Sequence, residues 1–345
     1  MKIQLNARNR AYHFDAAPDE RILYAGLSEA VALPYECGSG TCGTCKARLL
    51  SGEVDDRWPE APGRKFLKRP DEFLMCQCVA KGDVWIEVAS FVHGFDPGAF
   101  VPAAIKGVIR DPSMLTHDVM QLYVDIKQPM EFEAGQFALV QVPGVMGFRG
   151  WSMVDYVPGA KTLRFVVKKL PGGRLSDWLF SNPRAGIEVD VFGPLGVATF
   201  YPAIDKNIVC IAGGTGIAGM MAILARAASE NYFAEHDGDV FFGVRTMKDA
   251  FYLDEFARFS EQCGERMRVT VALSETAASE AEQARYPKLR FDFGFVHEVA
   301  GRAMKDRLQN VRAYLAGPPP AVDASVRMLL MSRVSTDNIR YDKFS

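Results

Sequence analysis

The most constraining feature of the chain is a run of three cysteines in a glycine-rich stretch, Cys37-Gly38-Ser39-Gly40-Thr41-Cys42-Gly43-Thr44-Cys45. Thiols at C-x4-C-x2-C spacing match the plant-type 2Fe–2S pattern, which requires one more cysteine further along the chain. The three glycines allow positive φ, so that backbone N–H groups turn towards the sulfurs. The stretch predicts an iron–sulfur loop and a small domain built to hold it.

A second segment offers two candidates for the fourth ligand, Cys76 and Cys78. We choose Cys76 because an apolar run precedes it, and we expect Cys78 to be a small buried side chain. The predicted metal ligands are therefore Cys37, Cys42, Cys45 and Cys76. A four-cysteine zinc site is the alternative, but such sites usually show two C-x2-C-like knuckles and only one is present here.

Composition limits the remaining possibilities. A chain of 345 residues is long enough for two or three domains, and a net charge of −2 offers no basic face for nucleic acid. Seven cysteines, several in a metal-binding spacing, favour a reducing compartment, and the N-terminus lacks the apolar core of a signal peptide. The apolar segment Asn207–Ala225 contains four glycines, which favour a strand, turn and helix over a membrane span. We expect a cytoplasmic protein.

The pattern divides the chain into three domains of α+β and α/β type. Residues 1–92 predict strands around one helix, a β-grasp-like plant-type ferredoxin domain, with elements at Lys2–Leu5, Ala11–Asp15, Ile22–Glu29, Lys46–Leu50 and Asp83–Val88. Residues 101–203 predict an antiparallel β-barrel, with strands at Ala104–Arg110, Val119–Ile126, Phe137–Val142, Thr162–Lys168 and Ile187–Phe192. Residues 204–345 alternate strand and helix, which predicts a parallel-sheet nucleotide domain.

Two stretches of the barrel region carry groups suited to a flat, phosphorylated cofactor. In Arg149-Gly150-Trp151-Ser152 an arginine can neutralise a diphosphate, an aromatic ring can stack, and a hydroxyl can bond a ring nitrogen. An ordinary exposed turn is the alternative interpretation. The stretch Val166–Ser176 adds a glycine pair and a hydroxyl at the start of an expected helix, Asp177–Phe180, where free N–H groups bind phosphate.

The third region contains a dinucleotide-binding pattern in its required setting. Gly214, Gly216 and Gly219 satisfy G-x-G-x-x-G between the apolar strand Ile208–Ala212 and a helix expected through Met221–Ala227. We expect a pyrophosphate to lie at the N-terminus of that helix.

Together, these motifs resemble those of the NADH-dependent reductase components of multicomponent bacterial oxygenases, and the resemblance covers nearly the whole chain. Residues 149–152 are similar to the family's R-x-[YF]-S flavin motif, and residues 172–176 resemble its flavin pyrophosphate motif. Phe242–Arg245 and Tyr314–Pro319 resemble two nucleotide-domain signatures. Pro34–Cys37 and Trp58–Gly63 look most like the reductases of toluene-type diiron monooxygenases. Two positions depart from the pattern: Ala316 replaces a common cysteine, and Gly219 a common proline.

The resemblance implies the cofactors FAD, NADH and a 2Fe–2S cluster, and a set of residues for each nucleotide. Ser152 would bond the flavin N5, Trp151 would stack on the flavin, and Arg149 would face its diphosphate. The FAD set is Arg149, Trp151, Ser152, Val166, Lys168, Gly172, Gly173, Ser176 and Phe344, the last in an aromatic tail. The NAD set is Gly214, Thr215, Gly216, Arg245, Glu275, Gly317 and Pro318.

One residue of the second set bears on cofactor choice. Glu275 follows a strand expected at Val269–Leu273, and an acid there accepts hydrogen bonds from a ribose diol but repels a 2′-phosphate. This predicts NADH over NADPH, although Arg245 near the end of the preceding strand would partly neutralise such a phosphate.

The resemblance implies an electron-transfer reductase that serves, as a monomer, the diiron hydroxylase of an aromatic or alkene monooxygenase. A Rieske ring-hydroxylating dioxygenase, reached directly or through a separate ferredoxin, is the alternative acceptor. A self-sufficient flavin enzyme and a non-catalytic iron–sulfur sensor are further alternatives, and the pair of nucleotide motifs weighs against the sensor.

Overall fold

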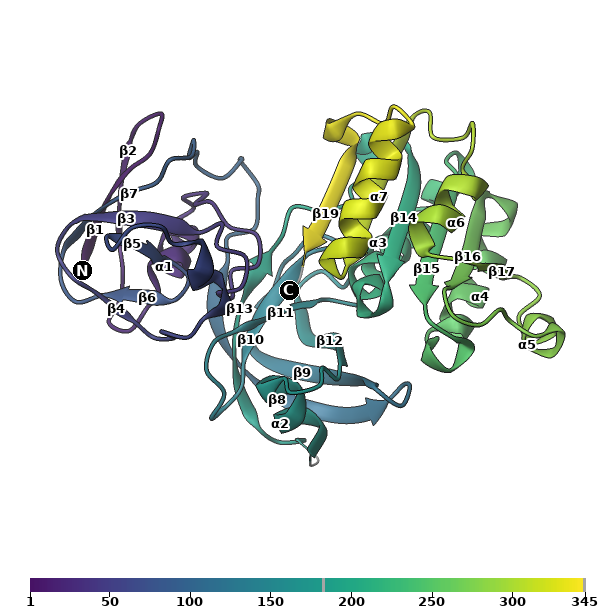
Figure 1. Cartoon of the computed structure of the whole chain (residues 1–345), viewed down its shortest axis with the longest axis horizontal. Coiled ribbons are helices and arrows are strands. Elements are labelled where there is room, and N and C mark those ends of the chain that lie inside the picture. Colours follow the sequence, from purple (N-terminus) through teal and green to yellow (C-terminus); the bar gives the residue numbers. More distant parts are fainter. Residues whose placement is uncertain (182–183, 344–345) are drawn as a thin grey trace.

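The protein consists of three modules arranged in chain order (Figure 1). The computed structural model describes residues 1–181 and 184–343. Phe344, assigned above to the flavin, therefore lies outside the described residues. In Figure 1 the N-terminal module lies at the left, a barrel at the lower centre and a parallel sheet with its helices at the right.

The N-terminal module is a five-stranded sheet wrapped around one helix, as the β-grasp prediction requires. Its strand order is β2-β1-β7-β3-β5, and only β1 and β7 run parallel. Six of the seven residues of helix α1 are buried beneath the sheet, because its sequence is almost entirely apolar. The elements are β1 (Lys2–Asn6), β2 (Ala11–Asp15), α1 (Ile22–Ser28), β3 (Lys46–Ser51), β4 (Val54–Asp56), η1 (Pro62–Phe66), β5 (Glu72–Leu74), β6 (Cys78–Ala80) and β7 (Val84–Glu87).

The second module is an antiparallel barrel with the strand order β11-β10-β13-β8-β9-β12. Its two outer strands approach each other, since the N–H of Val154, just after β11, donates to the Arg164 carbonyl of β12 at 3.0 Å. The elements are β8 (Ala103–Met114), β9 (Val119–Met130), β10 (Phe137–Gln141), β11 (Arg149–Ser152), β12 (Ala160–Lys168), α2 (Arg174–Ser181) and β13 (Glu188–Leu195). The sequence pattern predicted five of these strands but not β11, which coincides with the flavin motif.

The third module is a six-stranded parallel sheet with the order β17-β16-β15-β14-β18-β19. The order reverses between β14 and β18, and such a switch point opens a crevice at the carboxyl ends of the strands. The strands are β14 (Asn207–Gly213), β15 (Gly238–Val244), β16 (Met267–Leu273), β17 (Arg290–Phe293), β18 (Val311–Gly317) and β19 (Ile339–Lys343). The helices are α3 (Ile217–Ser229), α4 (Leu253–Cys263), α5 (Glu280–Arg285), α6 (Val296–Ala303) and α7 (Pro319–Met331).

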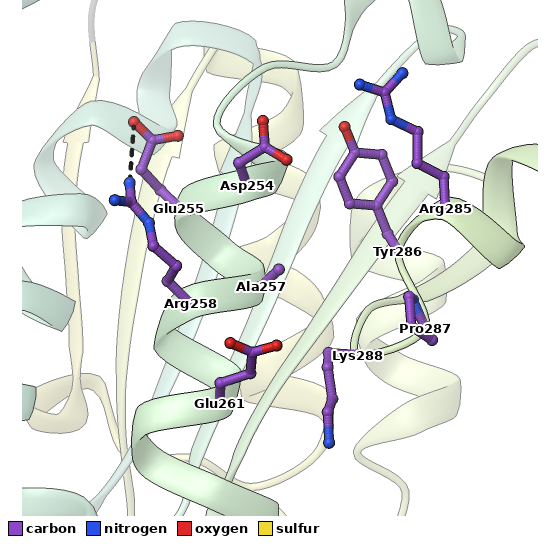
Figure 2. A pocket seen from close by; sticks show the side chains of 9 residues that line it. All are labelled: Asp254, Glu255, Ala257, Arg258, Glu261, Arg285, Tyr286, Pro287 and Lys288. Carbon is purple, nitrogen blue, oxygen red and sulfur yellow. Dashed lines mark ion pairs between the residues drawn. The ribbon is translucent and has the colours of Figure 1, made fainter.

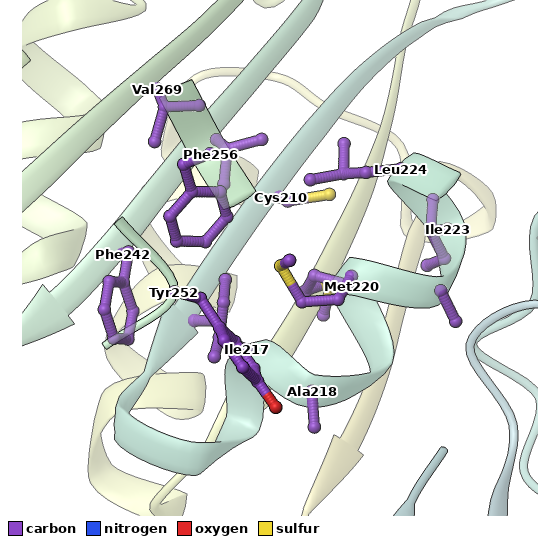
Figure 3. Close-up of a cluster of buried hydrophobic side chains, with 14 of the residues drawn as sticks. Cys210, Ile217, Ala218, Met220, Ile223, Leu224, Phe242, Tyr252, Phe256 and Val269 are labelled. Carbon is purple, nitrogen blue, oxygen red and sulfur yellow. The ribbon is translucent and has the colours of Figure 1, made fainter. Parts of the chain in front are cut away.

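One face of this sheet buries α3 and α4 in a hydrophobic core (Figure 3). Ile217, Met220 and Leu224 recur at helical spacing along α3 and are all buried. They pack with Phe242 of β15 and Phe256 of α4, both fully buried. This core fixes the N-terminus of α3 at the switch point.

The modules share apolar cores rather than meeting only through linkers. The ring of Tyr24 in α1 stacks on Phe192 of the barrel, with centroids 4.4 Å apart. On the other side of the barrel, Val119 and Val166 belong to the same buried cluster as α3. Within the described residues, no helix combines the length and the apolar character needed to cross a bilayer.

Candidate functional site

The four predicted cluster cysteines lie together at one end of the N-terminal module. The Sγ atoms of Cys45 and Cys76 are 3.1 Å apart, and a hydrogen bond from the Cys42 thiol lowers the pKa of Cys37. Backbone bonds lock the separate segment to the loop, because Met75 N donates to the Cys45 carbonyl at 3.1 Å. None of these thiols is in a disulfide.

The loop presents N–H groups to the sulfurs, as a bound cluster requires. Ser39 N and Cys42 N each lie 3.4 Å from Cys37 Sγ, and Thr44 N lies 3.5 Å from Cys42 Sγ. The buried amide of Gln77 donates to Cys76 Sγ at 3.3 Å. All three loop glycines have positive φ, at 61°, 90° and 76° for Gly38, Gly40 and Gly43. This donor set fits a 2Fe–2S cluster, which needs thiolate ligands and hydrogen bonds to sulfur.

Cys78 occupies a different environment from Cys76. It begins β6 and pairs across the small sheet with Asp56 of β4. Burial raises the pKa of its thiol, as expected for an inert cysteine.

A cleft of about 700 Å³ runs along the junction of the three modules. Its walls include Cys37 and Ser39 of the cluster loop, the barrel strands β11 and β12, and the carboxyl ends of the parallel strands. Predicted residues that line it are Arg149, Trp151, Ser152, Val166, Lys168, Gly173, Ser176, Gly214, Thr215, Gly216, Arg245, Gly317 and Pro318. Gly172 and Glu275 are not among the lining residues.

Arg149 enters this cleft as a cation without a carboxylate partner among the described residues. Its Nη1 donates to the Phe148 carbonyl at 2.9 Å, and burial lowers the pKa of the guanidinium. The guanidinium lies over the ring of Trp58, 4.8 Å from its centroid. Trp58 comes from the N-terminal module and packs so closely on Gly147 that a Cβ there would lie 2.4 Å from the indole. A half-buried guanidinium with no carboxylate partner among the described residues suits a diphosphate.

The other two residues of the β11 motif that were assigned to the flavin are Trp151 and Ser152. Trp151 is 5% exposed, and its ring lies 5.5 Å from that of Phe165. The Ser152 hydroxyl lies at the first turn of α3, because a Cβ on Gly219 would be 3.7 Å from its Oγ. That hydroxyl has no hydrogen-bond partner among the described residues, so it is free to bond a ligand in the cleft.

The turn before α2 differs from the predicted arrangement in one detail. Gly172 has φ of +72°, and this conformation brings the chain round to the helix. The Ser176 hydroxyl donates to the Leu170 carbonyl at 2.8 Å and accepts from Leu170 N at 3.1 Å. Ser176 therefore holds the turn itself, and the backbone N–H groups at the start of α2 are the donors available to a phosphate.

Two of the predicted site residues are cations that contact the same pair of carboxylates. Lys168 Nζ lies 3.2 Å from Asp118, and Arg245 lies 3.1 Å from Asp249 and 3.8 Å from Asp118. His117 adjoins the same carboxylates. Because the cations neutralise the two acids, this group serves as an ionic contact between barrel and nucleotide domain rather than as a metal site.

The glycine turn at the switch point disfavours side chains, by crowding at Gly216 and by positive φ at Gly214. A Cβ on Gly216 would lie 2.5 Å from Gly317 N, and Gly214 has φ of +54°. Such close backbone approach leaves the start of α3 open to a pyrophosphate. Glu275 is exposed beside this region, with its N–H donating to the Arg245 carbonyl at 2.9 Å.

Several lining residues were absent from the sequence-based site. Phe251 follows β15, and Gly294 and Phe295 follow β17. Their position after parallel strands was the available signal, since ligands bind at those carboxyl ends. Trp58 gave no such signal, because some ninety residues separate it from Arg149.

A second hollow lies on the nucleotide domain between α4 and the segment after α5 (Figure 2). Asp254 and Glu261 of α4 face Arg285 and Lys288, and none of the predicted site residues lies there. Glu255 is engaged by Arg258 at 3.9 Å.

Taken together, the modules define a flavin- and pyridine-nucleotide-dependent oxidoreductase with its own iron–sulfur domain. Three families match in chain order: the 2Fe-2S iron-sulfur cluster binding domain over residues 5–81, the oxidoreductase FAD-binding domain over 106–200 and the oxidoreductase NAD-binding domain over 210–327. The chain belongs to the ferredoxin–NAD(P)+ reductase components of multicomponent oxygenase systems. Its cofactors are accordingly a 2Fe–2S cluster, FAD and NAD.

Individual relatives cover nearly the whole chain. The ferredoxin–NAD(P)+ reductase CarAd of Metapseudomonas resinovorans is 34% identical over 94% of both chains. The xylene/toluene monooxygenase electron transfer component XylA of Pseudomonas putida is 29% identical over 99% of this chain and 93% of its own. Among solved structures, the ferredoxin reductase in carbazole 1,9a-dioxygenase superposes with a TM-score of 0.82 at 32% identity, covering 100% of this chain and 99% of that one.

Proposed function

We propose that the protein takes hydride from NADH and delivers electrons singly, through its cluster, to the diiron hydroxylase of an aromatic or alkene monooxygenase. Bound FAD supplies the conversion of a two-electron donor into one-electron deliveries. The observation that carries this proposal is the shared cleft, in which Cys37 and Ser39 face the same space as Arg149, Ser152 and the glycine turn.

Within this proposal the chain's own residues bind and orient the flavin and the pyridine nucleotide. Arg149 holds the flavin diphosphate, and Trp151 with Val166 forms an apolar wall that excludes water. The Ser152 hydroxyl donates to a flavin ring nitrogen. The glycine turn before α3 seats the pyrophosphate of NAD, with Gly317 opposite. No side chain has to act as a proton donor or acceptor for electrons to pass.

The acceptor has two candidates, each with its own support. Pro34–Cys37 and Trp58–Gly63 resemble toluene-type reductases, and XylA is the electron transfer component of a monooxygenase. The similarity to the ferredoxin reductase in carbazole 1,9a-dioxygenase supports the alternative, a Rieske dioxygenase system. Reconstitution with purified components of each type, scored by product formed per NADH, decides between them.

A cluster-depleted preparation tests the route itself. We expect such protein to reduce ferricyanide with NADH, because flavin reduction precedes the cluster, but to fail with cytochrome c. Undiminished cytochrome c reduction without iron would contradict the proposed exit route. The same result would favour a self-sufficient flavin enzyme.

We also propose that the protein acts in the cytoplasm as a monomer that meets its acceptor transiently. Seven free thiols, with no disulfide among the described residues, fit a reducing compartment.

A further inference from the structure

A short surface segment next to the cluster loop is strongly cationic. This basic segment, residues 64–69, reads Arg64-Lys65-Phe66-Leu67-Lys68-Arg69 and contains no acid. Arg64 is bound by Asp56. Lys65, Lys68 and Arg69 are exposed, and none of the three forms an ion pair with any described residue. Three solvated, unpaired cations in five residues are free to meet an anionic partner.

The basic segment is held against the cluster loop by close contacts. Gly63 N, near the start of η1, donates to the Gly40 carbonyl at 2.8 Å. The Phe66 ring covers Gly43 so tightly that a Cβ on that glycine would lie 2.6 Å from it. Phe66 is nonetheless 44% exposed, and Lys65 Nζ lies 5.1 Å from its ring centroid. An aromatic ring and free cations therefore border the loop directly.

The cluster loop has an inner and an outer side. Cys37 and Ser39 are buried and line the cleft, whereas Cys42 is partly exposed and Thr44 is exposed. Cys42 and Thr44 therefore mark the side of the loop that a partner protein can reach from solvent. Phe66 and the basic segment border this outer side.

We propose that the basic segment is the docking surface for the electron-acceptor protein, which binds through an acidic surface around its own metal centre. This inference rests on the proposed function, in which electrons leave through the cluster. Complementary charge steers two proteins into productive encounter, and a partly exposed aromatic ring is a typical interface contact. Two acids adjoin this edge: Glu36, exposed and accepting from Thr44 Oγ1 at 3.2 Å, and Glu72, which accepts from the backbone N–H groups of Lys68 and Arg69. Because Glu72 is paired with Lys46 at 3.2 Å, the three unpaired cations outnumber the one acid left to oppose them, Glu36.

A pair of probes that differ in charge tests the proposal with the holoprotein. Native cytochrome c is cationic, and succinylated cytochrome c is the same fold made anionic. We compare wild type with the triple variant Lys65→Glu, Lys68→Glu, Arg69→Glu. At low ionic strength the variant is expected to lose about tenfold in kcat/KM for the succinylated probe and to gain with the native one. Both differences shrink as salt is added.

A matched control variant makes the same change in net charge on the nucleotide domain. Lys288→Glu, Arg290→Glu, Lys305→Glu alters three exposed, unpaired cations of the nucleotide domain. Because distant charges are screened, its rates should change by about twofold or less. Binding is measured separately as retention on immobilised succinylated cytochrome c, which the docking variant alone should lose. Iron content, FAD content and ferricyanide reduction should be unchanged in both variants.

The outcomes separate this inference from the proposed function. If both triple variants lose equally in kcat/KM for succinylated cytochrome c, or if the docking variant loses nothing, the proposed docking surface is wrong. If succinylated cytochrome c is reduced equally well without the cluster, the proposed exit route fails instead. The neutral variant Lys65→Gln, Lys68→Gln, Arg69→Gln should lose activity in the same direction by a smaller factor, and its failure to do so also counts against docking by charge.

Discussion

Replacing Trp58 by alanine should weaken FAD binding even though Trp58 belongs to the iron–sulfur module. The indole is 8% exposed and lies 4.8 Å from the Arg149 guanidinium, which it holds towards the cleft. A cation–π contact of this kind stabilises by about 1–2 kcal/mol when partly desolvated. If the loss falls on FAD binding, the dissociation constant rises by about 5- to 30-fold.

Fluorescence titration of FAD into the flavin-free protein measures this effect. Trp58→Phe keeps an aromatic face and should recover most of the affinity. Trp85→Ala, at a tryptophan that is 40% exposed in the same module, controls for general destabilisation and should leave FAD binding unchanged. Iron content should stay constant throughout. Unaltered FAD affinity in Trp58→Ala, or equal losses in Trp58→Ala and Trp58→Phe, would refute the reasoning.

Three further predictions concern the cluster, the nucleotide and pH. Cys76→Ser should lose iron while NADH still reduces the flavin, and Cys78→Ser should keep its iron; iron assays showing the reverse would exchange the two assignments. Glu275→Arg should narrow the preference for NADH over NADPH, expected at about tenfold or more from a like-charge contact, and equal kcat/KM values in the wild type would contradict a role for this acid. Asp342 is half-buried, and partial removal of its carboxyl from water, together with the nearby charge of Glu36, raises its pKa to about 7. The folded state therefore holds this proton after the unfolded chain releases it, so stability should fall as pH rises from about 4 to about 7. Thermal unfolding across that pH range should show a smaller fall in stability for Asp342→Asn than for the wild type. An identical dependence of stability on pH in the two proteins would exclude the effect.

Local signals predicted the elements whose pattern is set by their own residues. The apolar run before Gly213 and the glycine turn after it identify β14 and the helix that follows, because strand periodicity and turn chemistry are both local. The expected span of that helix, Met221–Ala227, falls inside α3, which begins earlier, at Ile217. The C-x4-C-x2-C spacing likewise required glycines with positive φ, which the loop shows.

Other features depend on contacts that no short stretch encodes. Strand β11 was missed because Arg149–Ser152 is only four residues long and gains its strand conformation by pairing with β10. The Ser176 hydroxyl matched a phosphate-binding motif, yet it is used by Leu170 six residues away. The contact between Trp58 and Arg149 depends on how the N-terminal module packs against the barrel. Residue patterns within either module do not specify that packing.

The stacking of Trp58 on Arg149 has a consequence for modularity. The N-terminal module can be delimited in sequence and has the ligands for a complete cluster, which makes it look exchangeable between reductases. Its removal or replacement would nevertheless take away Trp58 and Ser39, one a support for the flavin arginine and the other part of the cleft wall. A chimera that imports a foreign iron–sulfur module should therefore need those two contacts restored before its flavin is held as tightly as in the parent chain.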